Sequence, residues 1–145
     1  MSIAIVLDTN VLIAGLRSPR GASFEVLRRI GSGDFDLSVS VPLVLEYEAV
    51  AKRQARELGL SFQDIDDVID YLCSVARHRQ IFYLWRPVLP DPRDDLVLEL
   101  AVEAGAECIV THNIRDFGPA CQFGVQPVKP RDFLRRLRGV SHEQH

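Results

Sequence analysis

Ile3-Ala-Ile-Val-Leu-Asp-Thr-Asn10 is the stretch of sequence that decides the predicted fold. Its five consecutive apolar residues are typical of a strand that is buried on both faces of a parallel sheet. The run ends at Asp8, and an apolar helix-like segment begins soon after it. Asp8 therefore follows the carboxyl end of a central strand, where open α/β sheets bind their ligands. The alternative is that Asp8, Thr9 or Asn10 only caps the next helix, since all three side chains favour that position.

Predicted strands and helices alternate along the rest of the chain. This alternation predicts right-handed crossovers and an α/β fold, with a mostly parallel sheet between layers of helices. The 145 residues are expected to form one domain at residues 1–138, followed by a flexible tail at residues 139–145. The further predicted strands are 37–41, 108–111 and 126–128, and a short extended piece is predicted at 81–85. The further predicted helices are 22–30, 42–58, 61–77, 92–104 and 130–138.

Composition argues against several classes of protein. No apolar run approaches the roughly 18 residues that span a bilayer, and the first residues lack the features of a signal peptide. Three cysteines without Cys-x-x-Cys spacing argue against a disulfide framework or a structural zinc site and predict a reducing, cytoplasmic location. The net charge of −3 argues against a protein that coats nucleic acid without specificity.

Acidic residues occur at the carboxyl ends of three predicted strands or on the helices that follow them. Glu46 has apolar neighbours that place it beside the buried stripe of its helix, where an unpaired carboxylate is costly. Asp94 shares a helical row with Leu98 and is expected to face the sheet, although it also fits a capping box with Asp91. Asp116 follows the predicted strand at residues 108–111.

Other polar residues of these segments are assigned to solvent or to loops. Asp95, Glu99 and Glu103 recur every four residues and are predicted to form an outward acidic stripe. His112 has no partner at metal-ligand spacing and is treated as a loop residue. Asn113 either caps a short turn or offers a neutral oxygen to a cation or water.

The four acids predict a metal-dependent hydrolase. At one edge of a sheet, Asp8, Glu46, Asp94 and Asp116 would repel one another and raise their own pKa values. Mg²⁺ or Mn²⁺ resolves this repulsion, because both ions accept carboxylates and water as ligands. A metal held in this way activates water and stabilises the charge on a phosphodiester during hydrolysis. The sequence contains no phosphate-binding loop, dinucleotide-binding motif or serine-hydrolase elbow.

Four segments of the chain resemble one family. They are Leu-Asp-Thr-Asn-Val-Leu (7–12), Leu-Glu-Tyr-Glu (45–48), Asp-Pro-Arg-Asp-Asp (91–95) and Ile-Val-Thr-His-Asn-Ile-Arg-Asp-Phe (109–117). In this order they resemble the PIN-domain nucleases, and specifically the VapC-like toxins of bacterial and archaeal toxin–antitoxin pairs. The resemblance implies a three-layer α/β/α sandwich, a Mg²⁺ or Mn²⁺ ion, endonuclease activity on single-stranded RNA and a cognate antitoxin. By position, the metal-site acids are Asp8, Glu46 and Asp94, with Asp116 as a less regular fourth.

Asn113 departs from the family pattern, since many members have Asp there. The lost charge affects the expected number of metal ions and the turnover more than the reaction class. Thr9 and Asn10 match the polar neighbours of the first Asp and are expected to orient a carboxylate or a phosphate. Arg17 and Arg20 lie just beyond the first helix and are candidates for contact with the RNA backbone, the alternative being solvated loop residues.

Two other functions compete with the toxin hypothesis. One is a non-catalytic PIN-like module that binds RNA or protein through the same groove, which Asn113 favours. The other is a housekeeping nuclease for RNA maturation or DNA flaps, against which the small size of the chain counts. Apolar residues at 62–75 and 133–137 offer a homodimer face, with ordinary packing as the alternative.

Overall fold

The computed structural model describes residues 3–81 and 88–143 of the chain. Its centre is a five-stranded sheet with the order β3-β2-β1-β4-β5, in which all four pairs of neighbouring strands are parallel. The central position predicted for residues 3–7 is confirmed, because Ile5, Val6 and Leu7 have no exposed surface. The strands are β1 (Ile3–Leu7), β2 (Phe35–Val39), β3 (Arg77–His78), β4 (Cys108–Val110) and β5 (Gln126–Val128).

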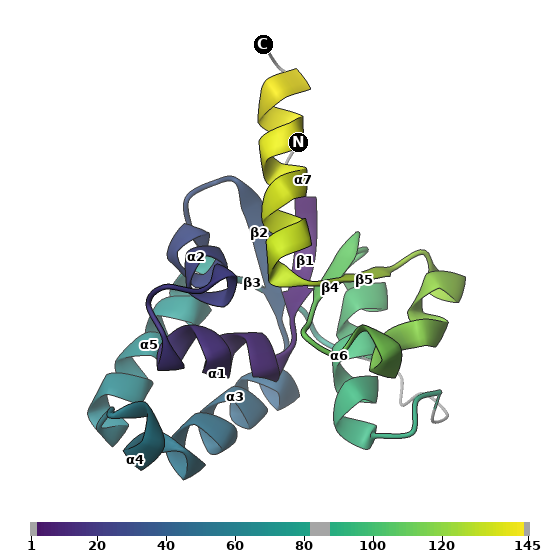
Figure 1. Ribbon diagram of the computed structural model, residues 1–145. Helices are drawn as coiled ribbons and strands as arrows, with labels where there is room; N and C mark the ends of the chain where they lie inside the picture. The colour runs from purple at the N-terminus through teal and green to yellow at the C-terminus, as the bar shows by residue number, and fades with distance from the viewer. Residues whose placement is uncertain (1–2, 82–87, 144–145) are drawn as a thin grey trace.

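Helices lie on both sides of the sheet, so the predicted α/β/α sandwich is confirmed (Figure 1). In this view α1, α2, α3 and α5 lie to the left of the strands, and α6 with the 3₁₀ segment η1 lies to the right. The helical elements are α1 (Thr9–Arg17), α2 (Ala22–Arg29), α3 (Val41–Arg53), α4 (Ala55–Leu58), α5 (Phe62–Val75), α6 (Pro92–Glu103), η1 (Ile114–Phe123) and α7 (Pro130–Glu143). None of the helices described is long and apolar enough to cross a membrane.

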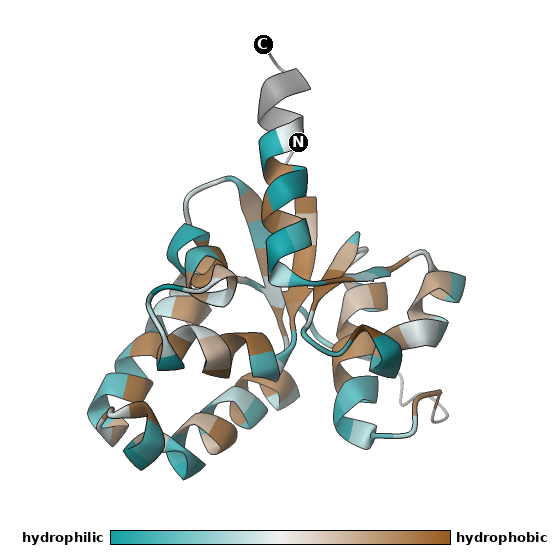
Figure 2. Ribbon diagram, in the orientation of Figure 1, coloured by the Kyte–Doolittle hydropathy of each residue, from teal (hydrophilic) through white to brown (hydrophobic). Residues whose placement is uncertain are grey.

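The core lies between these layers, where the apolar strands meet the inner faces of the helices (Figure 2). Phe133 of α7 is completely buried, and its ring meets the ring of Phe35 edge-on with 5.2 Å between the centroids. Burial of an aromatic side chain of this kind stabilises a fold by about 1.5–3 kcal/mol. Leu134 and Leu137 are also buried within the chain, so ordinary packing explains the apolar residues at 133–137.

Local sequence signals begin the helices that carry the acids. The Oγ of Ser40 accepts a hydrogen bond from the backbone N–H of Leu43 at the start of α3. The carboxylate of Asp91 accepts one from the backbone N–H of Arg93, and Pro92 occupies the first position of α6. A cap of this type contributes about 1 kcal/mol. It also fixes where the helix begins, and Asp94 consequently lies in the first turn of α6.

Two of the predicted strands differ from the structure. β2 begins at Phe35 rather than at residue 37, because its pairing with β1 starts at Ile3 opposite Phe35. The edge strand β3 has only two residues and lies where the end of a helix was predicted, since so short a strand leaves no periodic pattern. The short extended piece predicted at residues 81–85 falls almost entirely outside the described residues.

Three helical segments also differ. The helix predicted at residues 42–58 is interrupted at Gln54, where the backbone leaves the helical conformation between α3 and α4. η1 occupies ten residues to which the sequence assigned neither a helix nor a strand. α7 continues to Glu143, five residues beyond its predicted end. The flexibility of residues 139–145 stays a prediction.

The predicted outward acidic stripe on α6 is wrong at two of its three positions. Asp95 and Glu99 are buried, and only Glu103 is exposed. The carboxylate of Asp95 accepts hydrogen bonds from the backbone N–H groups of Val88 and Leu89. The four-residue spacing does not reveal this contact, by which the backbone of Val88 and Leu89 meets the side chain of Asp95.

Candidate active site

Asp8 is held in place by two strands. Its backbone N–H donates to the carbonyl oxygen of Val110, and its carboxylate accepts a hydrogen bond from Thr111 Oγ1 at 2.7 Å. Thr111 is fully buried, and its own N–H donates to the carbonyl oxygen of Val128. The side chain of Asp8 makes no capping hydrogen bond to α1, so the capping alternative does not explain this residue.

Glu46 reaches the same place from α3. The hydroxyl of the neighbouring Tyr47 donates to the carbonyl oxygen of Leu7, which fastens α3 to the end of β1. Thr9 Oγ1 donates to Glu46 Oε2 at 2.8 Å, and Arg93 Nε lies 3.5 Å from Glu46 Oε1. The side chain of Glu46 is only 14% exposed, which agrees with its predicted place beside the buried stripe.

Asp94 lies in the first turn of α6 and is partly buried. Its backbone N–H donates to the carbonyl oxygen of Asp91, as expected at the start of a helix. No capping box between Asp94 and Asp91 is present in this described segment, because Asp91 caps the helix through the N–H of Arg93. The capping alternative therefore does not explain the carboxylate of Asp94.

All four predicted acids line one cleft at the carboxyl edge of the sheet. The cleft has a volume of about 480 Å³. Asp8 follows the end of β1, Glu46 lies within α3, and Asp94 and Asp116 lie in the first turns of α6 and η1. The cleft is lined by Asp8, Thr9, Asn10, Ile13, Ala14, Arg17, Glu46, Val50, Gln54, Asp91, Arg93, Asp94, His112, Asn113 and Asp116.

The carboxylates in this cleft disfavour one another's charge. Burial raises the pKa of Asp94 to about 7, and the negative charges of Asp8, Asp91, Asp116 and Glu46 act in the same direction. The pKa of Asp8 is also raised, chiefly by burial, while its hydrogen bond from Thr111 opposes the shift. A positive charge placed between these groups is therefore favourable.

The carboxylates of this cleft have the chemistry that a hard divalent cation requires, but they are not arranged around a common point. Carboxylate oxygens, such as those of Asp8 and Asp94, are the ligands that Mg²⁺ and Mn²⁺ prefer. In residues 3–81 and 88–143, however, no three His, Cys, Asp or Glu side chains converge closely enough to hold a metal ion. Glu46 accounts for part of this, since its two oxygens face Thr9 and Arg93.

The predicted supporting residues have defined positions. Thr9 binds Glu46, as described, whereas Asn10 Oδ1 accepts a hydrogen bond from the backbone N–H of His112 at 3.3 Å. Asn10 thus holds the loop after β4 in place. Asn113 is exposed at the cleft, makes no side-chain capping bond and donates its N–H to Thr111 Oγ1.

Only one of the two arginines predicted to bind RNA lines the cleft. Arg17 lines the cleft, and its guanidinium donates to Gln54 Oε1 at 2.9 Å. Arg20 is exposed but does not line the cleft. Arg93, which was not predicted as a site residue, lines it instead.

Sequence analysis also missed Thr111, Tyr47 and the contact of His112. Thr111 comes directly after a buried strand, which is a detectable signal for a residue at the site. Tyr47 lies beside Glu46 and is indistinguishable in the sequence from an ordinary core aromatic. His112 is more than a loop residue, because its Nε2 lies 2.7 Å from Ser23 Oγ and it lines the cleft.

Comparison with known proteins identifies the family. A family model described as a PIN domain matches residues 4–115. The chain belongs to the PIN-domain family. PIN domains are generally nucleases and generally use divalent metal ions. The matched segment contains Asp8, Glu46 and Asp94 and ends one residue before Asp116.

A solved structure shares this PIN-domain fold. The chain is similar to a chain in the crystal structure of VapBC2 from Rickettsia felis bound to a DNA fragment from their promoter, with a TM-score of 0.59. The match has 14% sequence identity and covers 86% of this chain and 98% of that chain. At this identity the likeness shows the fold. A comparison with curated proteins gave no match.

We expect Thr111→Val to reduce catalysis by about 10- to 100-fold, the usual effect of losing a residue that orients a metal ligand. Valine keeps the shape of Thr111 but removes the donor to Asp8, whose pKa then rises further. Thr111→Ser retains the hydroxyl and serves as the matched control. If Thr111→Val and Thr111→Ser reduce the cleavage rate equally, the hydroxyl has no orienting role.

Proposed function

We propose that this PIN domain is a divalent-metal-dependent endoribonuclease that hydrolyses phosphodiester bonds of single-stranded RNA, and that it is the toxin of a toxin–antitoxin pair. One observation carries the proposal: Asp8, Glu46, Asp94 and Asp116 line one cleft, although they are far apart in the sequence. The family supports nuclease chemistry, and the raised pKa values of Asp8 and Asp94 support the binding of a cation.

Asp8 and Asp94 are the residues that we propose hold the metal ion, with Glu46 and Asp116 completing the set. A bound Mg²⁺ or Mn²⁺ ion supplies a water of lowered pKa and a positive charge beside the phosphodiester. Glu46 has to give up its contact with Arg93 to take part. Because the Arg93 side chain is 63% exposed, that ion pair is weak and its loss costs little.

The protein side chains then have distinct tasks. Thr111 fixes the direction of the Asp8 carboxylate, and Thr9 does the same for Glu46. In the metal-free chain the raised pKa of Asp94, about 7, favours its protonated form, and this proton has to leave when the carboxylate binds the ion. Arg17 and Arg93 line the cleft and supply cations for the phosphate groups of the substrate.

Separate observations support the proposed antitoxin partner, the cytoplasmic location and the homodimer face. The similar solved chain comes from the structure of VapBC2 from Rickettsia felis, which supports an antitoxin as the partner of this chain. Cys73, Cys108 and Cys121 are all free, which supports a reducing, cytoplasmic location. Phe62, Tyr71 and Val75 are exposed on α5 and support a homodimer face on that helix alone.

A non-catalytic RNA-binding module is the second candidate function. The carboxylates do not converge as ligands in the described residues, and Asn113 contributes no charge to the cleft. If the chain is such a module, it binds RNA without cleaving it, with or without divalent ions.

Cleavage assays distinguish the two functions. We expect the protein to cut single-stranded RNA internally in Mg²⁺ or Mn²⁺, to stop when EDTA is added and to leave duplex RNA intact. Duplex RNA and single-stranded DNA of the same sequence serve as controls. Intact RNA in both metals, with RNA binding retained, would favour the non-catalytic module.

A further inference from the structure

A second cleft, of about 660 Å³, lies directly beside the acidic cleft. Ala14, Arg17 and His112 line both clefts, so the two form one continuous surface. The second cleft is formed by the end of α1, the start of α2 and the first turns of α7. It is lined by Ala14, Arg17, Ser18, Gly21, Ala22, Ser23, His112, Lys129, Pro130, Arg131, Asp132 and Arg135.

This second cleft, called the basic cleft below, has the opposite charge to its neighbour. Arg17, Lys129, Arg131 and Arg135 line it against the single carboxylate of Asp132, which lies 3.8 Å from Arg135. Lys129 and Arg131 are exposed, and neither forms an ion pair with any residue of the described chain. Two cations are therefore available to an anionic ligand.

His112 lies where the two clefts meet and lines both of them. Its ring is held by Ser23 Oγ at 2.7 Å, and its backbone N–H donates to Asn10. Burial lowers the pKa of His112, and the positive charge of Lys129 lowers it further. Both effects favour the neutral form of the imidazole.

We propose that the basic cleft binds the phosphate backbone of the single-stranded RNA next to the scissile phosphodiester, through Arg17, Lys129 and Arg131. This inference rests on the proposed nuclease function. The carboxylates of the acidic cleft repel phosphate groups that lack a cation, so most of the binding energy has to come from cations beside them. The amino end of α7 adds a partial positive charge at the same place.

Charge also favours RNA over an acidic peptide as the ligand. A peptide carboxylate in the basic cleft would have to continue past the acidic cleft, where Asp8, Glu46, Asp94 and Asp116 repel it. An RNA strand carries further phosphates, and a divalent cation held by those four acids would attract the next of them. Contacts with the backbone alone give binding that depends on salt but little on sequence.

Salt dependence of RNA binding tests this inference. The probe is a short fluorescent single-stranded RNA of mixed sequence, bound by the Asp8→Asn chain in EDTA so that no cleavage occurs. A plot of log affinity against log salt has a negative slope, and each lost phosphate contact makes that slope shallower by about 0.7. At about 0.1 M salt, each lost contact also lowers the affinity roughly fivefold. We therefore expect Lys129→Ala with Arg131→Ala to weaken binding by roughly twentyfold and to reduce the slope by about 1.4.

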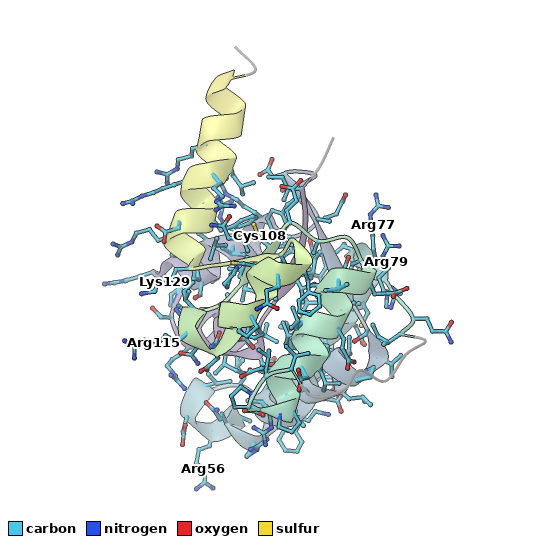
Figure 3. The ribbon with its side chains drawn as sticks, turned by 90° about the vertical axis from the view of Figure 1, so that its right-hand side faces the viewer. Arg56, Arg77, Arg79, Cys108, Arg115 and Lys129 are labelled. Atoms are coloured by element: carbon cyan, nitrogen blue, oxygen red, sulfur yellow. The ribbon has the colours of Figure 1, made fainter. Side chains whose placement is uncertain are left out.

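Arg56→Ala with Arg77→Ala is the matched control. This double variant removes the same two positive charges as the Lys129 and Arg131 variant. Arg56 and Arg77 line neither cleft, and Figure 3 shows both of them away from Lys129. The control is expected to change affinity less than twofold. Equal effects of the two double variants, or no effect of the Lys129 and Arg131 pair, would overturn the inference.

Failure of this inference and failure of the nuclease proposal are distinguishable. If the wild type cleaves RNA with a metal ion and the Lys129 and Arg131 variant binds RNA as before, only the inference that the basic cleft binds RNA is overturned. Loss of RNA binding in that variant, with no cleavage by the wild type in any metal, supports the basic cleft and overturns the nuclease proposal.

Discussion

Asp8→Asn is expected to lower metal-dependent RNA cleavage by about a thousandfold while the chain stays folded. The substitution removes one negative charge from the centre of the acidic cleft, and charge stabilisation by a bound metal contributes several kcal/mol to such reactions. Asparagine has the shape of Asp8 and keeps an oxygen that accepts the hydrogen bond from Thr111. Cleavage rates in Mg²⁺ and circular dichroism of the same preparations measure both expectations.

Asp70→Asn is the matched control for Asp8→Asn. Asp70 is exposed on α5 and lines neither cleft, so its loss of charge should leave cleavage within about twofold of the wild type. Undiminished cleavage by a folded Asp8→Asn chain would remove Asp8 from the mechanism.

Asp94→Asn is expected to have opposite effects on activity and on stability. Cleavage should fall by at least about a hundredfold, since a proposed metal ligand is lost. The metal-free fold should become more stable above pH 7. The pKa of Asp94 is raised to about 7 in the fold, so folding favours the protonated carboxyl and stability declines as pH rises from about 4 to about 7.

The size of the stability effect is modest because Asp94 is partly open to solvent. Screening by water limits it to about 1 kcal/mol or less at pH 8. Urea unfolding of the metal-free protein at pH 5 and pH 8 measures it, and the decline between these values should be smaller in Asp94→Asn than in the wild type. A wild-type stability that rises over this range, by an amount that Asp94→Asn abolishes, would contradict the raised pKa.

The sequence was sufficient to predict the sheet and the cleft because both depend on where buried strands end. Residues 3–7 and 108–110 are short apolar runs, and each is followed at once by a polar residue. Parallel strands place those ends at one edge, which is why Asp8 and Asp116 were predicted together although more than a hundred residues separate them.

Features that depend on pairs of distant residues could not be predicted. The burial of Asp95 depends on the N–H groups of Val88 and Leu89, which no helical period reveals. Tyr47 and Thr111 become site residues only through their bonds to Leu7 and Asp8. The basic cleft likewise forms between α1 and α7, so its cations are scattered in the sequence.

Direct measurement of metal binding tests the central claim, that the carboxylates of the acidic cleft share a divalent cation. Isothermal calorimetry with Mn²⁺ and Mg²⁺ at pH 7, in two buffers of different ionisation enthalpy, reports both the affinity and the protons released. We expect the wild type to bind an ion and to release protons from the carboxylates with raised pKa values, and we expect Asp8→Asn to lose this binding. Absence of binding at physiological Mg²⁺, or equal binding by the wild type and Asp8→Asn, would contradict the claim.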